Sequence, residues 1–290
     1  MPNILDLRRR IRSVKSTQQI TRAMKMVAGA RLRRAQERVV AARPYANEIR
    51  ALMESVVARI DPTQPDVNPL VVVRPLKKLL LVLITADRGL CGAFNSNLIR
   101  ATQAYLNEHA DLQISLLTVG NKGRDYFRKA RANIMSEHLN VFAKLQFSHA
   151  QAIAKEIIDA YSCGTVDAVD FLYNEFKSVL TQKLTVERFL PVVPSKAPAE
   201  ESRVDYIYEQ PPAEIFGRLL PRYVESQVYR ALLESQAAEL AAKTTAMDAA
   251  TRNASEMIDS LTLHMNRVRQ AAITKEIIEI VSGAAGQEEP

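Results

Sequence analysis

The segment DRGLCGAFN at 87–95 has the composition of a ligand-binding turn, because it places two glycines directly after the apolar run LLLVLI at 79–84. Turns between a buried strand and a helix bind dinucleotides in many α/β proteins, since backbone N–H groups at the helix N-terminus face the phosphates. Gly89 and Gly92 do not complete a GxGxxG pattern, and the chain contains no GxxxxGKS or GxxxxGKT phosphate loop. We therefore interpret the segment as a tight strand-to-helix turn and keep nucleotide binding as the alternative.

Cysteine and histidine residues are few, and their spacing argues against a catalytic or metal centre. Cys91 lies near a predicted helix N-terminus, where a thiolate is favoured, but no histidine is near it in sequence. Cys91 and Cys163 are far apart without metal-ligand spacing, and the four histidines also lack such spacing. We predict a buried structural Cys91, reduced thiols in a cytoplasmic setting, and no catalytic, cofactor or metal site.

Residues 76–190 predict a central α/β domain with Rossmann-like winding. The first two apolar runs in this segment have the continuous apolar character of parallel strands that helices cover. The predicted strands occupy 77–87, 113–120, 167–176 and 180–190, and the predicted helices occupy 95–109, a segment after Lys122, and 147–161. Because the last two strands are close in sequence, we expect them to form a hairpin at the edge of the sheet.

A seven-residue apolar repeat flanks this domain on both sides and predicts a long antiparallel two-helix coiled coil, with one helix over 1–61 and the other over 211–290. The first helix is expected to bend at Pro44 without ending there. Its repeat positions are Ile4, Leu7, Ile11, Val14, Gln18, Thr21, Lys25, Ala28, Leu32, Ala35, Val39, Ala42, Ala46, Ile49, Met53, Val56 and Ile60. Those of the second helix are Leu233, Ala237, Leu240, Thr244, Met247, Thr251, Ala254, Ile258, Leu261, Met265, Val268 and Ala272.

The positive charge of the chain is concentrated in its first 60 residues. They hold 14 Lys or Arg against four Asp or Glu, a net charge of +10, whereas the whole chain carries +7. A helix this basic is expected to face an acidic partner, which could be nucleic acid, anionic lipid or acidic protein. No apolar run approaches the length of about 18 residues that a membrane span needs, and arginines interrupt any N-terminal signal segment.

Two stretches of the predicted coil depart from the apolar repeat and indicate further partners. Gln18, Thr21 and Lys25 are polar residues at three consecutive repeat positions. Burying their polar groups between two helices would cost free energy, whereas exposing them to solvent would not. Apolar residues occupy a neighbouring face instead, at Ile20, Met24 and Val27. We therefore expect this stretch to face a third partner in part, and we expect the apolar end of the second helix, from Ile273, to need a sleeve that covers it.

Several segments resemble the gamma subunit of F-type ATP synthases. They are RSVKSTQQITRAMKMVAGARLRRAQ at 12–36, LITADRGLCGAFN at 83–95, ATRNASEMIDSL at 250–261 and ITKEIIEIVSGAAG at 273–286. The last of these is similar to the signature of that family, and the resemblance spans nearly the whole chain. It implies a rotor whose two terminal helices form a bent coil inside a hexamer of alternating alpha and beta subunits.

In such a rotor, ion flow turns the ring of c subunits together with the coil, and the uneven coil surface moves each beta subunit through its conformations. The nucleotide sites belong to the alpha and beta chains, so the resemblance implies a non-catalytic subunit without a cofactor. The implied partners are the alpha, beta and epsilon subunits and the c ring, with one copy of this chain per complex and no nucleic acid. The implied location is the cytoplasmic face of the bacterial inner membrane, where the chain is peripheral and its membrane association indirect.

The resemblance also assigns contacts to particular residues. Arg269, Gln270 and Thr274 match positions that touch the catch loop of the beta subunit, and Met24 and Lys25 match the region that faces its acidic lever loop. Positions in the apolar bearing of the hexamer match Ile277, Ile280 and Val281. Positions in the foot that meets the c ring and the epsilon subunit match Tyr206, Tyr208 and Glu209.

Two alternatives from other classes remain open at this point. A nucleotide-binding α/β enzyme requires an acidic ribose ligand and a catalytic His or Cys pair, neither of which the sequence offers. A basic coiled-coil nucleic-acid binder is compatible with the charge, although its arginines would share one helix with the heptad positions. Its binding would depend steeply on salt concentration.

Overall fold

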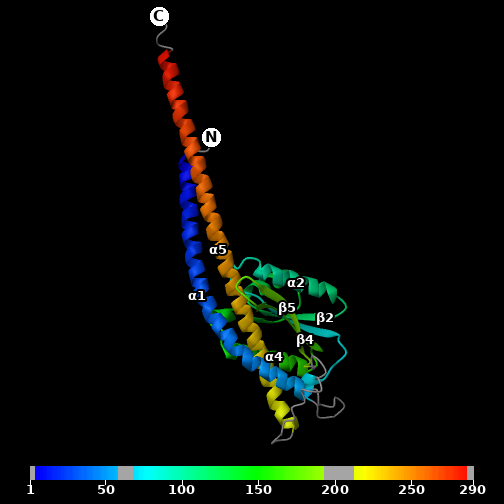
Figure 1. The fold of residues 1–290 in the computed structure, drawn as a ribbon. Helices are drawn as coiled ribbons and strands as arrows, with labels where there is room; N and C mark the ends of the chain where they lie inside the picture. Colours follow the sequence, from blue (N-terminus) through cyan, green and yellow to red (C-terminus); the bar gives the residue numbers. More distant parts are fainter. Residues whose placement is uncertain (1–3, 58–67, 193–211, 286–290) are drawn as a thin grey trace. The chain divides into compact units, whose positions relative to one another are not determined.

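The computed structural model describes residues 4–57, 68–192 and 212–285 (Figure 1). The chain divides into two compact units, one with residues 1–28 and 244–290 and the other with residues 29–243. We call them the helical unit and the α/β unit and describe each by itself. Helices α1 (Ile4–Val57) and α5 (Pro212–Ala285) contribute residues to both units.

The α/β unit is built on a five-stranded sheet with the order β3-β2-β1-β4-β5. The strands are β1 (Lys78–Ile84), β2 (Gln113–Val119), β3 (Ile134–His138), β4 (Ala168–Phe176) and β5 (Gln182–Leu190). β1 to β4 are parallel, and β5 pairs antiparallel with β4 at the edge, so the predicted hairpin is confirmed. β1 lies at the centre because its LLLVLI run has no polar side chain to expose, and all six residues are 0% exposed.

Helices α2 (Phe94–Glu108), α3 (Asn121–Lys129) and α4 (Phe147–Ser162) lie at the predicted places and connect the parallel strands, with short turns η1 (Pro69–Val71) and η2 (Val141–Ala143) between other elements. Strand β3 is missing from the predicted strands. Its five residues are only half-buried or exposed at the sheet edge, so they carry a short and weak apolar signal.

The part of α5 that belongs to the α/β unit is buried on nearly all sides between Leu220 and Ala241. The heptad repeat places only Leu233, Ala237 and Leu240 of this stretch at an interface. The structure also buries residues between those positions, among them Val224, Val228, Leu232 and Ala238. A helix that is apolar on several faces packs on several sides, so this stretch is a core helix of the α/β unit as well as a partner of α1.

In the helical unit, α1 and α5 lie side by side in opposite directions (Figure 1). Apart from Lys25, the predicted repeat positions of α1 in this unit are buried or half-buried: Ile4, Leu7, Ile11, Val14, Gln18, Thr21 and Ala28. The same holds for those of α5: Thr244, Met247, Thr251, Ala254, Ile258, Leu261, Met265, Val268 and Ala272. The heptad period therefore predicts the interface of this antiparallel coil correctly.

Two features of the long helices agree with the sequence-based expectations. α1 continues through Pro44, so the proline does not end the helix, and α5 begins at Pro212. The domain limits at 1–61, 76–190 and 211–290 stay a prediction. Among the described helices, none is long and apolar enough to cross a membrane.

Candidate partner-binding surfaces

Three polar pairs join α1 and α5 inside the helical unit. Gln18 donates from Nε2 to Ser255 Oγ at 2.6 Å, and Thr251 Oγ1 donates to Thr21 Oγ1 at 2.9 Å. One helical turn further, Lys25 Nζ lies 2.5 Å from Asp248 Oδ1. Because each buried polar group has a partner, the coil avoids the cost of unpaired polar atoms.

These pairs limit how much of the polar stretch is left for the expected third partner. Gln18 and Thr21 remain in the interface, and Thr21 is only 9% exposed. The signal for their partners is present in the sequence, because Thr251 is itself a polar repeat position of the second helix. An antiparallel alignment of the two repeats brings Thr21 and Thr251 opposite each other.

Lys25 is the most exposed of these polar positions, and it already has an acidic partner within the chain. Its side chain is 45% exposed, and that of Asp248 is 37% exposed. The hydrogen bond from Lys25 lowers the pKa of Asp248, which also lies 3.4 Å from Arg252. A partner carboxylate that approaches Lys25 would therefore share the ammonium group with Asp248.

An apolar stripe lies exposed on α1 beside the polar positions. Ile20 is 56% exposed and Val27 is 54% exposed, whereas Met24 between them is half-buried. The spacing of three and four residues places them on one face of the helix. The predicted neighbouring apolar face is thus accessible at Ile20 and Val27.

The C-terminal stretch of α5 has no described segment of α1 opposite it. Continuing the register of the polar pairs places Ile4, the first described residue of α1, opposite Arg269. Beyond Ala272, the apolar residues of α5 are 49–71% exposed: Ile273, Ile277, Ile278, Ile280 and Val281. Figure 1 shows this red end of α5 continuing past the described start of α1.

The residues assigned to the catch loop lie in the same stretch. Arg269, Gln270 and Thr274 are exposed, and Thr274 Oγ1 donates to the carbonyl of Gln270 at 2.9 Å. Together with Ile277, Ile280 and Val281 they leave a largely accessible helix surface. Tyr206, Tyr208 and Glu209, assigned to the foot, lie outside the described residues.

The glycine-containing turn of the α/β unit is closed by its own side chains. Asn95 Oδ1 accepts from the backbone N–H of Ala86 at 3.0 Å, and Asn95 Nδ2 lies 3.1 Å from Cys91 Sγ. Cys91 is 2% exposed, and burial raises the pKa of its thiol. This favours the predicted structural cysteine over a thiolate nucleophile.

Three histidines of the α/β unit have local structural contacts. His109 stacks on Tyr105, His138 Nε2 lies 3.1 Å from Glu156, and His149 Nδ1 accepts from a backbone N–H at the start of α4. In the part of the chain that the structure describes, no cluster of His, Cys, Asp or Glu could hold a metal ion. The accessible surfaces of the coil, rather than a reactive centre, are the candidate site.

Comparison with known proteins gives one consistent result. A family model described as ATP synthase matches residues 3–286. The ATP synthase gamma chain of Solibacter usitatus is 53% identical over 290 residues, which cover 99% of this chain and 100% of that one. The ATP synthase gamma chain of Pelotomaculum thermopropionicum is 49% identical, with 99% and 100% covered.

Solved structures of central stalks are similar as well. A chain in the central stalk and c ring of the Tetrahymena thermophila mitochondrial ATP synthase is 28% identical with a TM-score of 0.61, covering 80% of this chain and 99% of that one. A chain in the Euglena gracilis mitochondrial ATP synthase has a TM-score of 0.71 at 24% identity, covering 99% and 96%. The second likeness supports the fold.

Proposed function

Since the chain belongs to the family of ATP synthase gamma chains, we propose that it is the central rotor shaft of an F-type ATP synthase. It couples ion-driven rotation of the membrane c ring to conformational changes in the catalytic beta subunits. The observation that carries this proposal is the 53% identity to a gamma chain over 99% of the sequence. Similarity limited to the α/β unit would not identify a function, because one fold can serve many functions. The similarity to the gamma chain also includes both long helices.

As a gamma chain, the protein is a non-catalytic subunit of the complex. The two alternatives, a nucleotide-binding enzyme and a nucleic-acid binder, receive no support from the relatives, which match along the full length. The basic face of α1 then has an acidic protein surface as its partner. Electrostatic attraction of this kind acts over distance and tolerates sliding, which suits a turning contact.

The proposed contacts follow the exposure of the coil. Lys25, with Met24, faces the acidic lever loop of the beta subunit. The Lys25 side chain is 45% exposed, which supports this contact because its ammonium group can still donate to a second carboxylate. Arg269, Gln270 and Thr274 face the catch loop. An apolar bearing around Ile277, Ile280 and Val281 would cover side chains that are 56–71% exposed in the isolated chain.

The remaining partners are proposed on the family alone. The foot with Tyr206, Tyr208 and Glu209 meets the c ring and the epsilon subunit, and one copy of the chain occupies each complex. The chain is peripheral to the membrane, at the cytoplasmic face of the bacterial inner membrane, and its membrane association is indirect. Functionally, 1–61 and 211–290 form the shaft, and 76–190 forms the domain that meets the foot partners.

Assembly with matching alpha and beta subunits tests the proposal. The purified chain is mixed with these subunits, and the mass of the complex and its steady-state ATP hydrolysis are measured. We expect one copy of the chain per hexamer and a rise in hydrolysis when the chain is added. A chain that stays separate and leaves hydrolysis unchanged would contradict the rotor function.

A further inference from the structure

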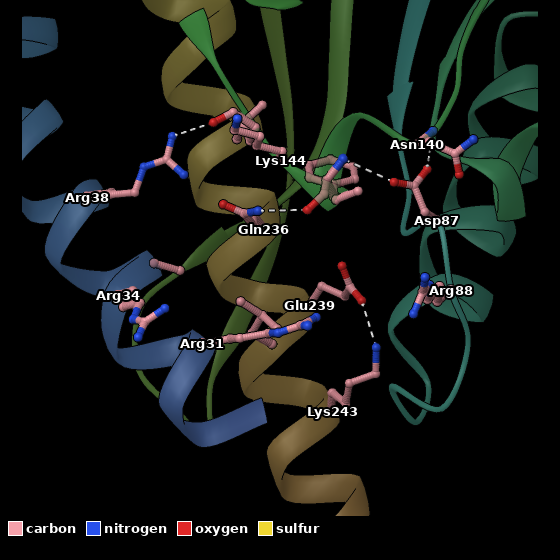
Figure 2. A pocket seen from close by; sticks show the side chains of 15 residues that line it. Arg31, Arg34, Arg38, Asp87, Arg88, Asn140, Lys144, Gln236, Glu239 and Lys243 are labelled. Atoms are coloured by element: carbon pink, nitrogen blue, oxygen red, sulfur yellow. Dashed lines mark hydrogen bonds and ion pairs between the residues drawn. The ribbon is translucent and has the colours of Figure 1, made fainter. Parts of the chain in front are cut away.

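The α/β unit contains a pocket of about 530 Å³ whose walls come from separate segments of the chain (Figure 2). α1 and α5 contribute one part of the lining, and the loop after β1 and the segment 140–145 contribute the rest. Figure 2 shows Arg31 and Arg34 on α1 at one side of the pocket and Arg88 at the other. Sequence reasoning misses this pocket because its residues converge only in the folded chain.

The pocket lies at the edge of the sheet where open α/β folds bind ligands. From β1 the chain proceeds outward to β2 and β3 and then returns to β4 on the other side of β1, so the order of strands reverses beside β1. Ligands of such sheets bind outside the carboxyl ends of the strands at this reversal. Asp87 and Arg88 follow β1 in the loop before α2, and Asn140 follows β3, so the pocket lies at the carboxyl ends of β1 and β3, on one side of this reversal.

Cations outnumber anions in the lining. It contains six cations against two carboxylates, Asp87 and Glu239; the cations are Arg31, Arg34, Arg38, Arg88, Lys144 and Lys243. Asp87 is used by the fold, because its two oxygens accept from the backbone N–H groups of Asn140 and Phe142 at 2.9 and 3.0 Å. Glu239 is paired with Lys243 at 3.1 Å.

The cations of the pocket differ in whether their side chains bond to other residues of the chain. Arg38 donates to the carbonyl of Leu145 at 2.8 Å and to the Tyr229 hydroxyl at 2.9 Å. By contrast, the side chains of Arg34, Arg88 and Lys144 are exposed and make no hydrogen bond or ion pair with any residue that the structure describes. Like charges that converge without a partner repel one another, and a bound anion would remove that repulsion.

We propose that this pocket binds a multivalent phosphate anion, either a free polyphosphate or the triphosphate group of a nucleotide, through Arg34, Arg88 and Lys144. Guanidinium groups match phosphate oxygens bidentately, and the pocket has the size of a small-molecule site. Three of the six cations lie on one face of α1, and the other three come from the loop after β1, the segment 140–145 and α5. Their arrangement around a hollow favours a compact anion over an extended acidic segment. The site is independent of the rotor function.

The test is isothermal titration calorimetry of the full-length chain with inorganic tripolyphosphate, at constant ionic strength and without alpha and beta subunits. The pocket variant is Arg34→Gln with Arg88→Gln. Its matched control is Arg33→Gln with Arg100→Gln, which removes the same charge at two exposed positions that do not line the pocket. All four arginine side chains are exposed, so both variants are expected to fold, and circular dichroism checks this.

We expect the pocket variant to bind tripolyphosphate about tenfold or more weakly than the unaltered chain, since two charged contacts are lost. The control is expected to stay within about twofold. No binding to the unaltered chain, or an equal loss in both variants, would overturn the proposal.

Three further titrations, with ATP, adenosine and a hexaglutamate peptide, identify the source of the anion. ATP that binds like tripolyphosphate supports free polyphosphate as the ligand, and ATP that binds at least tenfold more tightly supports a nucleotide. Adenosine is expected not to bind, and adenosine that binds as well as ATP would overturn the assignment to phosphate. A hexaglutamate peptide that binds more tightly than tripolyphosphate and is weakened by the pocket variant alone would replace the proposal with an acidic protein segment.

Discussion

At the scale of single residues, a few carboxylates join several elements of the α/β unit at once. Glu187 on β5 accepts from Arg50 on α1 at 2.6 Å, from Arg230 on α5 at 3.0 Å and from the Tyr173 hydroxyl on β4 at 3.1 Å. Glu234 on α5 similarly links α1 and β4. Hydrogen bonds and ion pairs of this kind fix the positions of helices and strands relative to one another, because they are directional and apolar packing is not. Such contacts suit a shaft that transmits torque to its own domain.

The stability of the α/β unit should depend on pH through Glu187. Burial is the largest influence and raises the pKa of Glu187, but the attraction of Arg230 and Arg50 outweighs it, so the pKa lies below its ordinary value. A carboxyl with a lowered folded pKa adds stability above its unfolded pKa and loses it as pH falls through the folded value. We expect Glu187→Gln to lower the free energy of unfolding at neutral pH, with a difference that narrows below about pH 4.5.

Urea unfolding between about pH 7 and pH 3 measures this difference. Glu175, a half-buried carboxylate on the same strand pair, is not a suitable control because it lies 2.6 Å from Lys177. Glu48, on the exposed face of α1, is a better one, and Glu48→Gln should leave the pH profile unchanged. A Glu187→Gln deficit that stays constant over the whole range would contradict the assigned ion pairs.

Glu234 should contribute more than any surface ion pair. Its side chain is 2% exposed, and it accepts from Arg43 Nε at 2.9 Å and from the backbone N–H of Phe176 at 3.1 Å. We expect Glu234→Ala to lower the free energy of unfolding by about 2–3 kcal/mol, less than for a fully buried pair because Arg43 is 38% exposed.

Glu37→Ala is the matched control, since it removes a glutamate whose pair with Arg33 is exposed at 3.5 Å. It should change the free energy of unfolding by less than about 0.5 kcal/mol in urea titrations. Equal losses in the two variants would show that the buried carboxylate has no special function in the fold.

Residues of this kind could not be paired from the sequence. Arg43 and Glu234 are 191 positions apart, and the basic helix offers many arginines of similar surroundings. Only the register of α1 against α5 selects Arg43, and that register becomes known from the folded chain. The same holds for Asp248, which the heptad pattern leaves beside a repeat position instead of on one.

At the scale of elements, Lys25 can act in two ways: it can stabilise the coil through Asp248, or it can contact the beta subunit. We expect Lys25→Gln to slow ATP hydrolysis by the assembled complex by about two- to fivefold, the effect of losing one exposed charge pair. Asp248→Asn removes only the partner within the chain and should leave the rate unchanged or raise it.

Steady-state hydrolysis of both variants separates the two functions of Lys25. If Lys25 acts through the lever loop, the two variants differ. If both variants slow hydrolysis equally, the bond of Lys25 to Asp248 within the coil accounts for the effect. This result would contradict the proposed contact of Lys25 with the beta subunit.

The exposed helix surface at the end of α5 gives a second prediction at this scale. Arg269→Ala or Gln270→Ala should lower hydrolysis by the assembled complex about two- to tenfold, as when one interface contact is removed. Arg267→Ala is the control for Arg269→Ala, because Arg267 is also exposed but lies two residues from Arg269 and therefore on another face of the helix. Unchanged turnover of Arg269→Ala in a complete complex would contradict the catch-loop contact.

The elements differ in how well the sequence predicts them. Long periodic segments are predictable, since the heptad period marks the buried positions of α1 and the parallel strands β1 and β2 are continuous apolar runs. β3 is not, because five alternating residues at a sheet edge carry little pattern. The additional burial of α5 between Leu220 and Ala241 also escapes the heptad pattern, which describes one partner helix and not a sheet domain.

At the scale of the whole molecule, the chain works through contacts with its partners and not through a catalytic site of its own. The described surface of the coil carries exposed apolar side chains and exposed charges of both signs, and Asn95 holds the glycine-containing turn through Ala86 and Cys91. The family explains this division, since the proposed catalysis takes place in neighbouring subunits. The proposed function therefore requires that this chain rotates inside the hexamer.

Direct observation of rotation tests that claim. Cys163 is exposed and Cys91 is buried, so a gold nanorod can be attached through Cys163 in the natural chain. The chain is assembled with cysteine-free alpha and beta subunits, the hexamer is fixed to a surface through the beta subunits, and ATP is added. The account predicts sustained rotation of the rod in one direction. A hexamer that hydrolyses ATP while the rod stays still, or turns equally in both directions, would contradict it.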